Sequence, residues 1–227
     1  MELDITLPEE IPVMTLPNVT FFPQALMPLH IFEPRYRQML VDVLATNRLF
    51  AVAGLNQAML GQENQFEPPH RVASVGIVRA CQENSDGTSN LLLQGLCRVE
   101  FLEIVTDKPY RRVRAKVLTS EPHTAAEEIS TLRRELSGLL RLKQKLGAPM
   151  PTEITDFLRQ VNDAETFVDL AAFSLCENLL VKQKLLETLN ISSRLSLFSR
   201  QLKREIEAIK LQRKLQANLP ESRINEN

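Results

Sequence analysis

The chain has 227 residues, of which 44% are hydrophobic, and it carries 27 lysine and arginine residues against 28 aspartate and glutamate residues. This length supplies enough apolar sequence for one large domain or two small ones. The charges are also nearly balanced within each half of the chain. That balance argues against a general nucleic-acid-binding protein and leaves room only for a local basic stripe.

The cysteines and the N-terminus indicate a soluble cytoplasmic protein. Cys81, Cys97 and Cys176 form no CxxC pair, and an odd number of cysteines is typical of reduced, buried thiols. The first four residues lack the basic and apolar regions of a signal peptide. Since no apolar run approaches the roughly 20 residues of a membrane span, we expect no membrane association.

Residues 11–40 combine short apolar segments with prolines and end in a helix start. Proline removes a backbone donor, so its repeated use here favours short, bent strands. A helix is predicted to begin at Glu33-Pro34, since proline fits the first helical turn. Its apolar face is Tyr36, Met39, Leu40 and Val43. We expect this helix to close one end of a small barrel, with Phe22 and Tyr36 in the core.

Further strands are predicted over residues 49–55, 72–82 and 90–105. The last two form a hairpin, because Asp86-Gly87 supplies the backbone angles of a tight turn. Gly95 interrupts the second strand of this hairpin and predicts a bulge or a corner.

Residues 110–118 alternate between apolar and basic side chains, as a strand with one wet face does. The inward set is Tyr110, Val113, Ala115 and Val117. The basic set is Arg111, Arg112, Arg114 and Lys116. Two interpretations stay open: the charges protect a solvated edge strand from pairing with other sheets, or they bind RNA or another anionic ligand.

From residue 121 onward the apolar residues recur at helical spacing. Breaks are predicted at Gly147, at Asn162 or Asp163, and at Asn190. The third helix is predicted to run through Leu179, and a short turn or helix containing Leu185 follows it. A long final helix is predicted to begin at Ile191.

The glycines form no phosphate-binding loop, no GxGxxG pattern and no GxSxG pattern. His30, His70 and His123 are scattered, and no pair of histidines or cysteines has the spacing of a zinc site. We therefore expect no cofactor, no metal and no enzymatic activity. His30 lies among apolar residues of the sequence and is predicted to be structural.

Several stretches, in the same order along the chain, resemble the N-terminal domain of Lon protease, in the form found in stand-alone Lon-domain proteins that lack the ATPase and protease domains. The stretches are Leu16-Pro17-Asn18, Phe22-Pro23, Pro28-Leu29-His30, Ile31 to Arg37, Leu93 to Val99, Lys182 to Glu187 and Arg194-Leu195.

The resemblance implies an α+β fold in two parts. Residues 1–120 would form a mostly antiparallel, PUA-like pseudo-barrel with one short helix. Residues 121–227 would form an α-helical bundle that ends in a long helix. The division into strands and helices follows from periodicity, whereas the barrel topology comes from the resemblance.

The resemblance also implies a non-catalytic substrate-recognition module for protein quality control. Such a module would bind unfolded or tagged polypeptides or a proteolysis partner, through an apolar patch or an open sheet edge. RNA or small-ligand binding through the barrel is the alternative.

Residues 56–70 form a long segment without clear periodicity that still carries apolar side chains. Met59, Leu60 and Phe66 either fold back onto the domain or line an apolar groove for extended polypeptide. Methionine and phenylalanine are adaptable contact residues, so we take these three as the candidate binding site.

Overall fold

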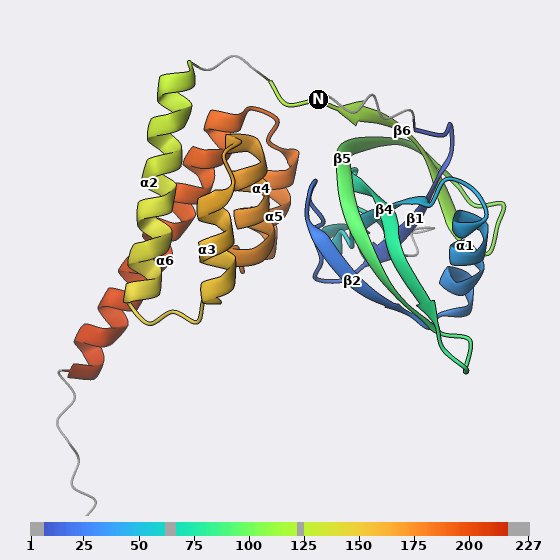
Figure 1. Cartoon of the computed structure of the whole chain (residues 1–227), viewed down its shortest axis with the longest axis horizontal. Coiled ribbons are helices and arrows are strands. Elements are labelled where there is room, and N and C mark those ends of the chain that lie inside the picture. The colour runs from blue at the N-terminus through green and yellow to red at the C-terminus, as the bar shows by residue number, and fades with distance from the viewer. Residues whose placement is uncertain (1–6, 62–66, 122–124, 218–227) are drawn as a thin grey trace, which may run out of the picture.

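The computed structural model describes residues 7–61, 67–121 and 125–217. A β-rich half (residues 7–121) and a helical half (residues 125–217) lie side by side (Figure 1). The elements of the β-rich half are β1 (Ile11–Leu16), β2 (Leu26–Ile31), α1 (Pro34–Leu44), β3 (Leu49–Gly54), the 3-10 helix η1 (Gln57–Met59), β4 (Val72–Glu83), β5 (Ser89–Val105) and β6 (Arg111–Leu118). Those of the helical half are α2 (Ala126–Lys145), α3 (Thr152–Gln160), α4 (Ala164–Leu175), α5 (Leu179–Glu187) and α6 (Ile191–Ala217).

The strands of the described residues form a sheet that closes on itself. Its order is β2-β5-β4-β3-β1-β6, and β5 pairs with β6 as well as with β4. β1 and β3 are parallel, and the other pairs are antiparallel. This is the mostly antiparallel pseudo-barrel that we expected, followed by helices and ending in a long one. The division into two subdomains near residue 120 stays a prediction.

β6 is an edge strand over only part of its length. Its first residues, 111–113, pair with β1, where Val113 lies opposite Ile11, whereas residues 112–118 pair with β5. The predicted alternation holds at Val113, which is fully buried, but fails at Val117, which is 44% exposed. The edge interpretation is therefore wrong for Arg111 and Arg112, and it stays a prediction for Arg114 and Lys116, which lie beyond the pairing with β1.

α1 begins where Glu33-Pro34 predicts and packs through the predicted face, whose four apolar residues are all buried. The backbone amide of Thr15 in β1 donates a hydrogen bond of 3.2 Å to the Tyr36 hydroxyl. Tyr36 is 5% exposed, which confirms its place in the core. The contact fixes the helix against the barrel.

The predicted irregularity at Gly95 is confirmed by a shift of register between β4 and β5. The turn before β2 approaches β5 at this point. The amide of Gln24 donates to the Gly95 carbonyl, and the amide of Gly95 donates to the Ala25 carbonyl, both at 2.9 Å. A Cβ atom at Gly95 would lie 2.1 Å from the carbonyl oxygen of Phe22, so this contact requires glycine.

The helical half follows the predicted breaks with one correction. The Asp163 carboxylate accepts a hydrogen bond of 2.7 Å from the amide of Thr166, as an N-cap does. The third helix predicted for the helical half is α4. It ends at Leu175 instead of running through Leu179, because Asn178 caps a new helix, α5. α6 begins at the predicted Ile191 and lies along α2 (Figure 1).

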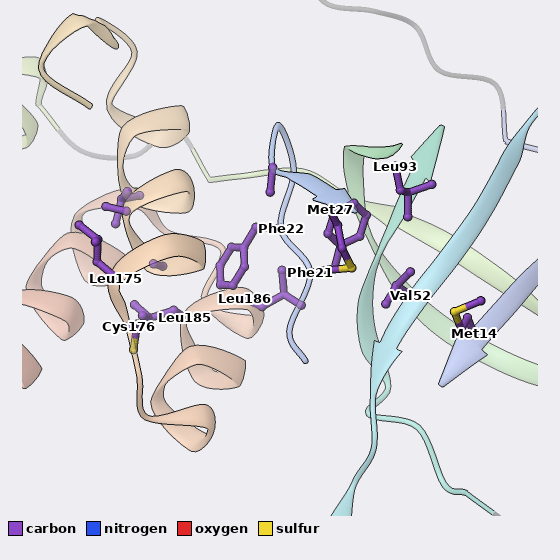
Figure 2. Packing of buried hydrophobic residues seen from close by; sticks show 14 of the residues in the cluster. Met14, Phe21, Phe22, Met27, Val52, Leu93, Leu175, Cys176, Leu185 and Leu186 are labelled. Carbon is purple, nitrogen blue, oxygen red and sulfur yellow. The ribbon is translucent and has the colours of Figure 1, made fainter. Parts of the chain in front are cut away.

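One hydrophobic cluster is shared by the two halves. Phe21 and Phe22, from the segment between β1 and β2, lie with Leu186 between the strands and the helices (Figure 2). The rings of Phe21 and Phe173 meet edge to face, with their centroids 6.4 Å apart. Phe22 is fully buried, which confirms its predicted core position. β3 is buried on both faces, and a second cluster fills the other side of the sheet.

Candidate binding cleft between the two halves

A cleft of about 460 Å³ lies where the β-rich half and the helical half face each other. The β-rich half contributes residues 18–20, residues 54–58 and His70 to its walls. The helical half contributes residues 177–180 and Gln183. A volume of this size is typical of ligand-binding pockets and can hold several side chains of a bound polypeptide.

Close backbone contacts shape the wall from the β-rich half. A Cβ atom at Gly54 would lie 2.5 Å from the carbonyl oxygen of Val19. The end of β3 can therefore approach the segment that contains Val19 only with glycine at this position. The amide of His70 donates a hydrogen bond of 2.9 Å to the Gly54 carbonyl. Burial lowers the pKa of the His70 ring, which favours its neutral form in the cleft.

The wall from the helical half is held by Gln183 in α5. Its side-chain nitrogen donates a hydrogen bond of 3.0 Å to the carbonyl oxygen of Val72, which ties α5 to β4. The first turn of α5 carries two leucines at the rim of the cleft, Leu179 at 38% exposed and Leu180 at 81% exposed. Adjacent exposed leucines at the rim of a hollow mark a surface that can accept apolar side chains.

The predicted apolar loop begins at this cleft. Its first residues, 56–58, line the wall from the β-rich half. Met59, the last residue of η1, is half-buried, and Leu60 is 50% exposed. Phe66 lies outside the described residues. The assignment of Met59, Leu60 and Phe66 to a binding groove stays a prediction.

The basic residues of β6 are satisfied within the chain. Arg111 donates to a backbone carbonyl, and the other three form ion pairs. Arg111 contacts the carbonyl oxygen of Glu67 at 2.7 Å, and Arg112 pairs with Asp107 at 2.6 Å. Arg114 pairs with Glu103 at 3.0 Å, and Lys116 pairs with Glu100 at 2.8 Å. Such pairing reduces the net field of the strand. RNA binding through these four residues stays a prediction, and the ion pairs weigh against it.

A buried ion network joins the two halves, and the sequence did not predict it. Arg98 of β5 and Arg194 of α6 each place a guanidinium nitrogen 2.6 Å from the same carboxylate oxygen of Asp169 in α4. The three side chains are 3%, 0% and 2% exposed, respectively. Arg98 also donates to the carbonyl oxygen of Leu186 at 3.1 Å. Burial lowers the pKa of Arg194, and the Asp169 charge opposes that effect.

Part of this network was visible in the sequence. Arg98 and Arg194 both lie in stretches that carry the family resemblance, but nothing in the pattern shows that they meet, since they are far apart in the chain. Asp169 indicated a buried ion pair more directly than either arginine did. A carboxylate within the apolar run from Phe167 to Ala172 must find a cation if the helix is buried.

Among the residues that the structure describes, no group of histidine, cysteine or acidic side chains could hold a metal ion. None of the described helices combines the length and the apolar character needed to cross a membrane. Burial raises the pKa of the Cys97 and Cys176 thiols to about 11, which disfavours the reactive thiolate. His30 is exposed, and its Nδ1 atom lies 2.8 Å from the side-chain oxygen of Asn90. Its structural role stays a prediction.

Solved structures with the same fold define the class of domain. The N-terminal domain of the Lon protease of the Mycobacterium avium complex superposes with a TM-score of 0.65, covering 86% of this chain and 98% of that one at 17% identity. A Lon N-terminal domain protein from Xanthomonas campestris superposes with a TM-score of 0.55, covering 82% and 95% at 17% identity. These likenesses establish the fold.

Sequence comparison then gives the family. Residues 10–204 match the family described as the ATP-dependent protease La (LON) substrate-binding domain, and the chain belongs to this family. Lon protease of Dictyoglomus thermophilum is 26% identical over 92% of this chain, and Lon protease of Syntrophus aciditrophicus is 26% identical over 95% of it. The matched regions make up 26% and 28% of those two proteins, so the chain spans about a quarter of their length.

Proposed function

We propose that this chain is a non-catalytic module that binds unfolded or tagged polypeptides in the cleft between its two halves. The observation that carries the proposal is the exposed pair Leu179 and Leu180 at the rim of a cleft of about 460 Å³. Membership of the substrate-binding-domain family supports polypeptide as the ligand. The module would serve protein quality control by presenting such chains to a proteolysis partner.

The physical basis is the burial of a few apolar side chains against preformed walls. Burying one leucine side chain contributes about 1.5–3 kcal/mol, and ordering the bound chain opposes part of that gain. Two leucines with backbone contacts therefore support reversible binding with a Kd of about 1 μM or weaker. Weak, reversible binding suits a module that must release its ligand to a partner.

The test is a double change at the rim of the cleft. Leu179→Ser/Leu180→Ser should weaken binding of a labelled, permanently unfolded polypeptide, followed by fluorescence anisotropy, about tenfold or more. The matched control is Leu211→Ser/Leu215→Ser, which changes two leucines of α6 that are 59% and 60% exposed. Equal binding by the two variants, both with unchanged melting temperatures, would show that the rim of the cleft does not bind polypeptide.

The apolar loop gives a second test of the same surface. The triple change Met59→Ser/Leu60→Ser/Phe66→Ser should weaken binding of the unfolded probe and leave the thermal unfolding of the domain intact. If the variant unfolds, these side chains belong to the core. If folding and binding are both unaffected, the groove does not include this loop.

A further inference from the structure

Four arginines gather around a second pocket, of about 380 Å³, between α2 and α3. Arg133, Arg134 and Arg141 come from α2, and Arg159 comes from α3. Arg134 and Arg141 are seven residues apart, a spacing that places them on one side of that helix. No carboxylate is among the described residues that line the pocket. The balanced composition of the helical half hid this local excess of positive charge.

Two of the four arginines already have structural partners. Arg133 donates to the carbonyl oxygens of Val161 and Asn162, the latter at 2.8 Å, and lies over the Phe167 ring at 4.9 Å from its centroid. Arg159 pairs with Asp156 at 2.7 Å. The contacts of Arg133 hold the turn after α3 against α2, and the Arg159 pair lies within α3.

Arg134 and Arg141 are different. The hydrogen bond of Arg134 goes to the Thr131 hydroxyl at 3.2 Å, and both arginines are exposed. Within the described residues, neither of them forms an ion pair with a carboxylate of the chain. Two unneutralised guanidinium groups on one pocket are available to an anionic ligand, which they can bind through charge-assisted hydrogen bonds.

The floor of the pocket is apolar. Leu140, Leu158 and Phe167 line it and are 5%, 3% and 2% exposed. Arg134 and Arg141 are seven residues apart on α2, which separates them by about 10 Å along the helix. About three residues of extended polypeptide span the same length, so one acidic segment can bring a carboxylate to each of the two arginines.

We infer that this pocket binds a polypeptide segment in which acidic side chains flank apolar ones. The carboxylates pair with Arg134 and Arg141, and the apolar side chains occupy the pocket above Leu140 and Leu158, which have little exposed surface of their own. This inference rests on the proposed function and deepens it, because it names a class of sequence that the module prefers. The preference adds to the general apolar binding at the cleft between the halves.

The experiment uses two short labelled peptides with the same apolar residues, one carrying aspartate where the other carries asparagine. The protein should bind the aspartate peptide about five- to tenfold more tightly at low ionic strength, as expected for two partly exposed ion pairs. Arg134→Gln/Arg141→Gln should remove this preference and leave binding of the asparagine peptide unchanged. The control Arg200→Gln/Arg204→Gln, at exposed positions of α6, should keep it.

The outcomes separate this inference from the proposed function. If the asparagine peptide binds but aspartate brings no gain, or if the gain survives Arg134→Gln/Arg141→Gln, the inference is wrong and the proposed function stands. If calorimetry shows inorganic phosphate binding as tightly as the aspartate peptide, the pocket is a compact-anion site and the inference is also wrong. If neither peptide binds, the proposed function fails together with the inference.

Discussion

The same helix, α5, supplies one residue to a closed junction between the two halves and another to the open cleft between them. At the junction, Leu186 packs with Phe22 and is 1% exposed, and its carbonyl accepts a hydrogen bond from Arg98. At the cleft, Leu180 is 81% exposed. Gln183 lies between these two leucines along the helix and is bound to β4.

The difference between the junction and the cleft shows how an apolar surface can stay open. The shared core and the buried ion network hold the halves together at one end of α5, so the leucines at the other end need not collapse onto the barrel. A cleft held open in this way is preorganised, and it loses less conformational entropy when a ligand binds.

Removal of Asp169 should have the largest effect on stability. In Asp169→Ala, two buried arginines lose the carboxylate that both contact at 2.6 Å, and the free energy of unfolding should fall by about 3–5 kcal/mol. Urea denaturation measures this fall. The control is Glu207→Gln, which removes an exposed pair with Lys210 and should leave the urea midpoint nearly unchanged. Equal effects of the two changes would mean that the network does not hold the halves together.

Truncation of the aromatic core at the junction should have the next largest effect. Phe22→Ala should lower the free energy of unfolding by about 3–4 kcal/mol, because it leaves a cavity between the strands and the helices. Phe32→Ala changes an aromatic residue that is 61% exposed, and its melting temperature should match that of the unchanged protein. If the melting temperature of Phe22→Ala also matches that of the unchanged protein, Phe22 does not stabilise the junction.

A methyl group at Gly95 tests the close contact between β5 and the backbone of Phe22, whose side chain packs between the strands and the helices. Gly95→Ala should lower the free energy of unfolding by about 2 kcal/mol, since the new Cβ atom overlaps the Phe22 carbonyl oxygen. The matched change is Gly138→Ala in α2, where a Cβ atom meets nothing within 4 Å. That change should instead stabilise the protein by about 0.5–1 kcal/mol. Thermal unfolding of the pair should give shifts of opposite sign.

Asp42→Asn should have the smallest effect on stability and should leave the junction and the cleft unchanged. Hydrogen bonds, first from Lys108 and then from Tyr110, lower the pKa of the Asp42 carboxyl from 3.8 to about 2. The charged carboxylate therefore stabilises the fold fully above pH 3.8, and this contribution is lost as the pH falls through about 2. The stability difference between the protein and the variant should be constant near neutrality and shrink across this window. A difference that grows as the pH falls would contradict the assignment.

Much of the fold could be predicted because local patterns decide it. The proline-rich opening, the face of α1 that includes Tyr36 and the start of α6 at Ile191 all depend on residues close in sequence. The break between α4 and α5 was predicted after Leu179 instead of after Leu175, because the apolar spacing continues through it, and the Asn178 cap ends that continuity.

The candidate site was predicted only in part because its geometry depends on distant residues. The sequence indicated the loop that starts at the cleft, but it could not show that Leu180 lines the same cleft. The pairing of β6 on both sides and the meeting of Arg98 with Arg194 at Asp169 are also long-range contacts. Periodicity reports which face of an element is buried and does not identify its partner.

The most direct test of the central proposal is hydrogen exchange of the whole chain with and without a neutral, permanently unfolded polypeptide. Binding in the cleft should slow exchange at residues 54–58 and 177–183, and the junction around Leu186 should exchange slowly in both states. Slowed exchange along β6, with residues 54–58 and 177–183 unchanged, would contradict the proposal that the cleft between the two halves binds polypeptide.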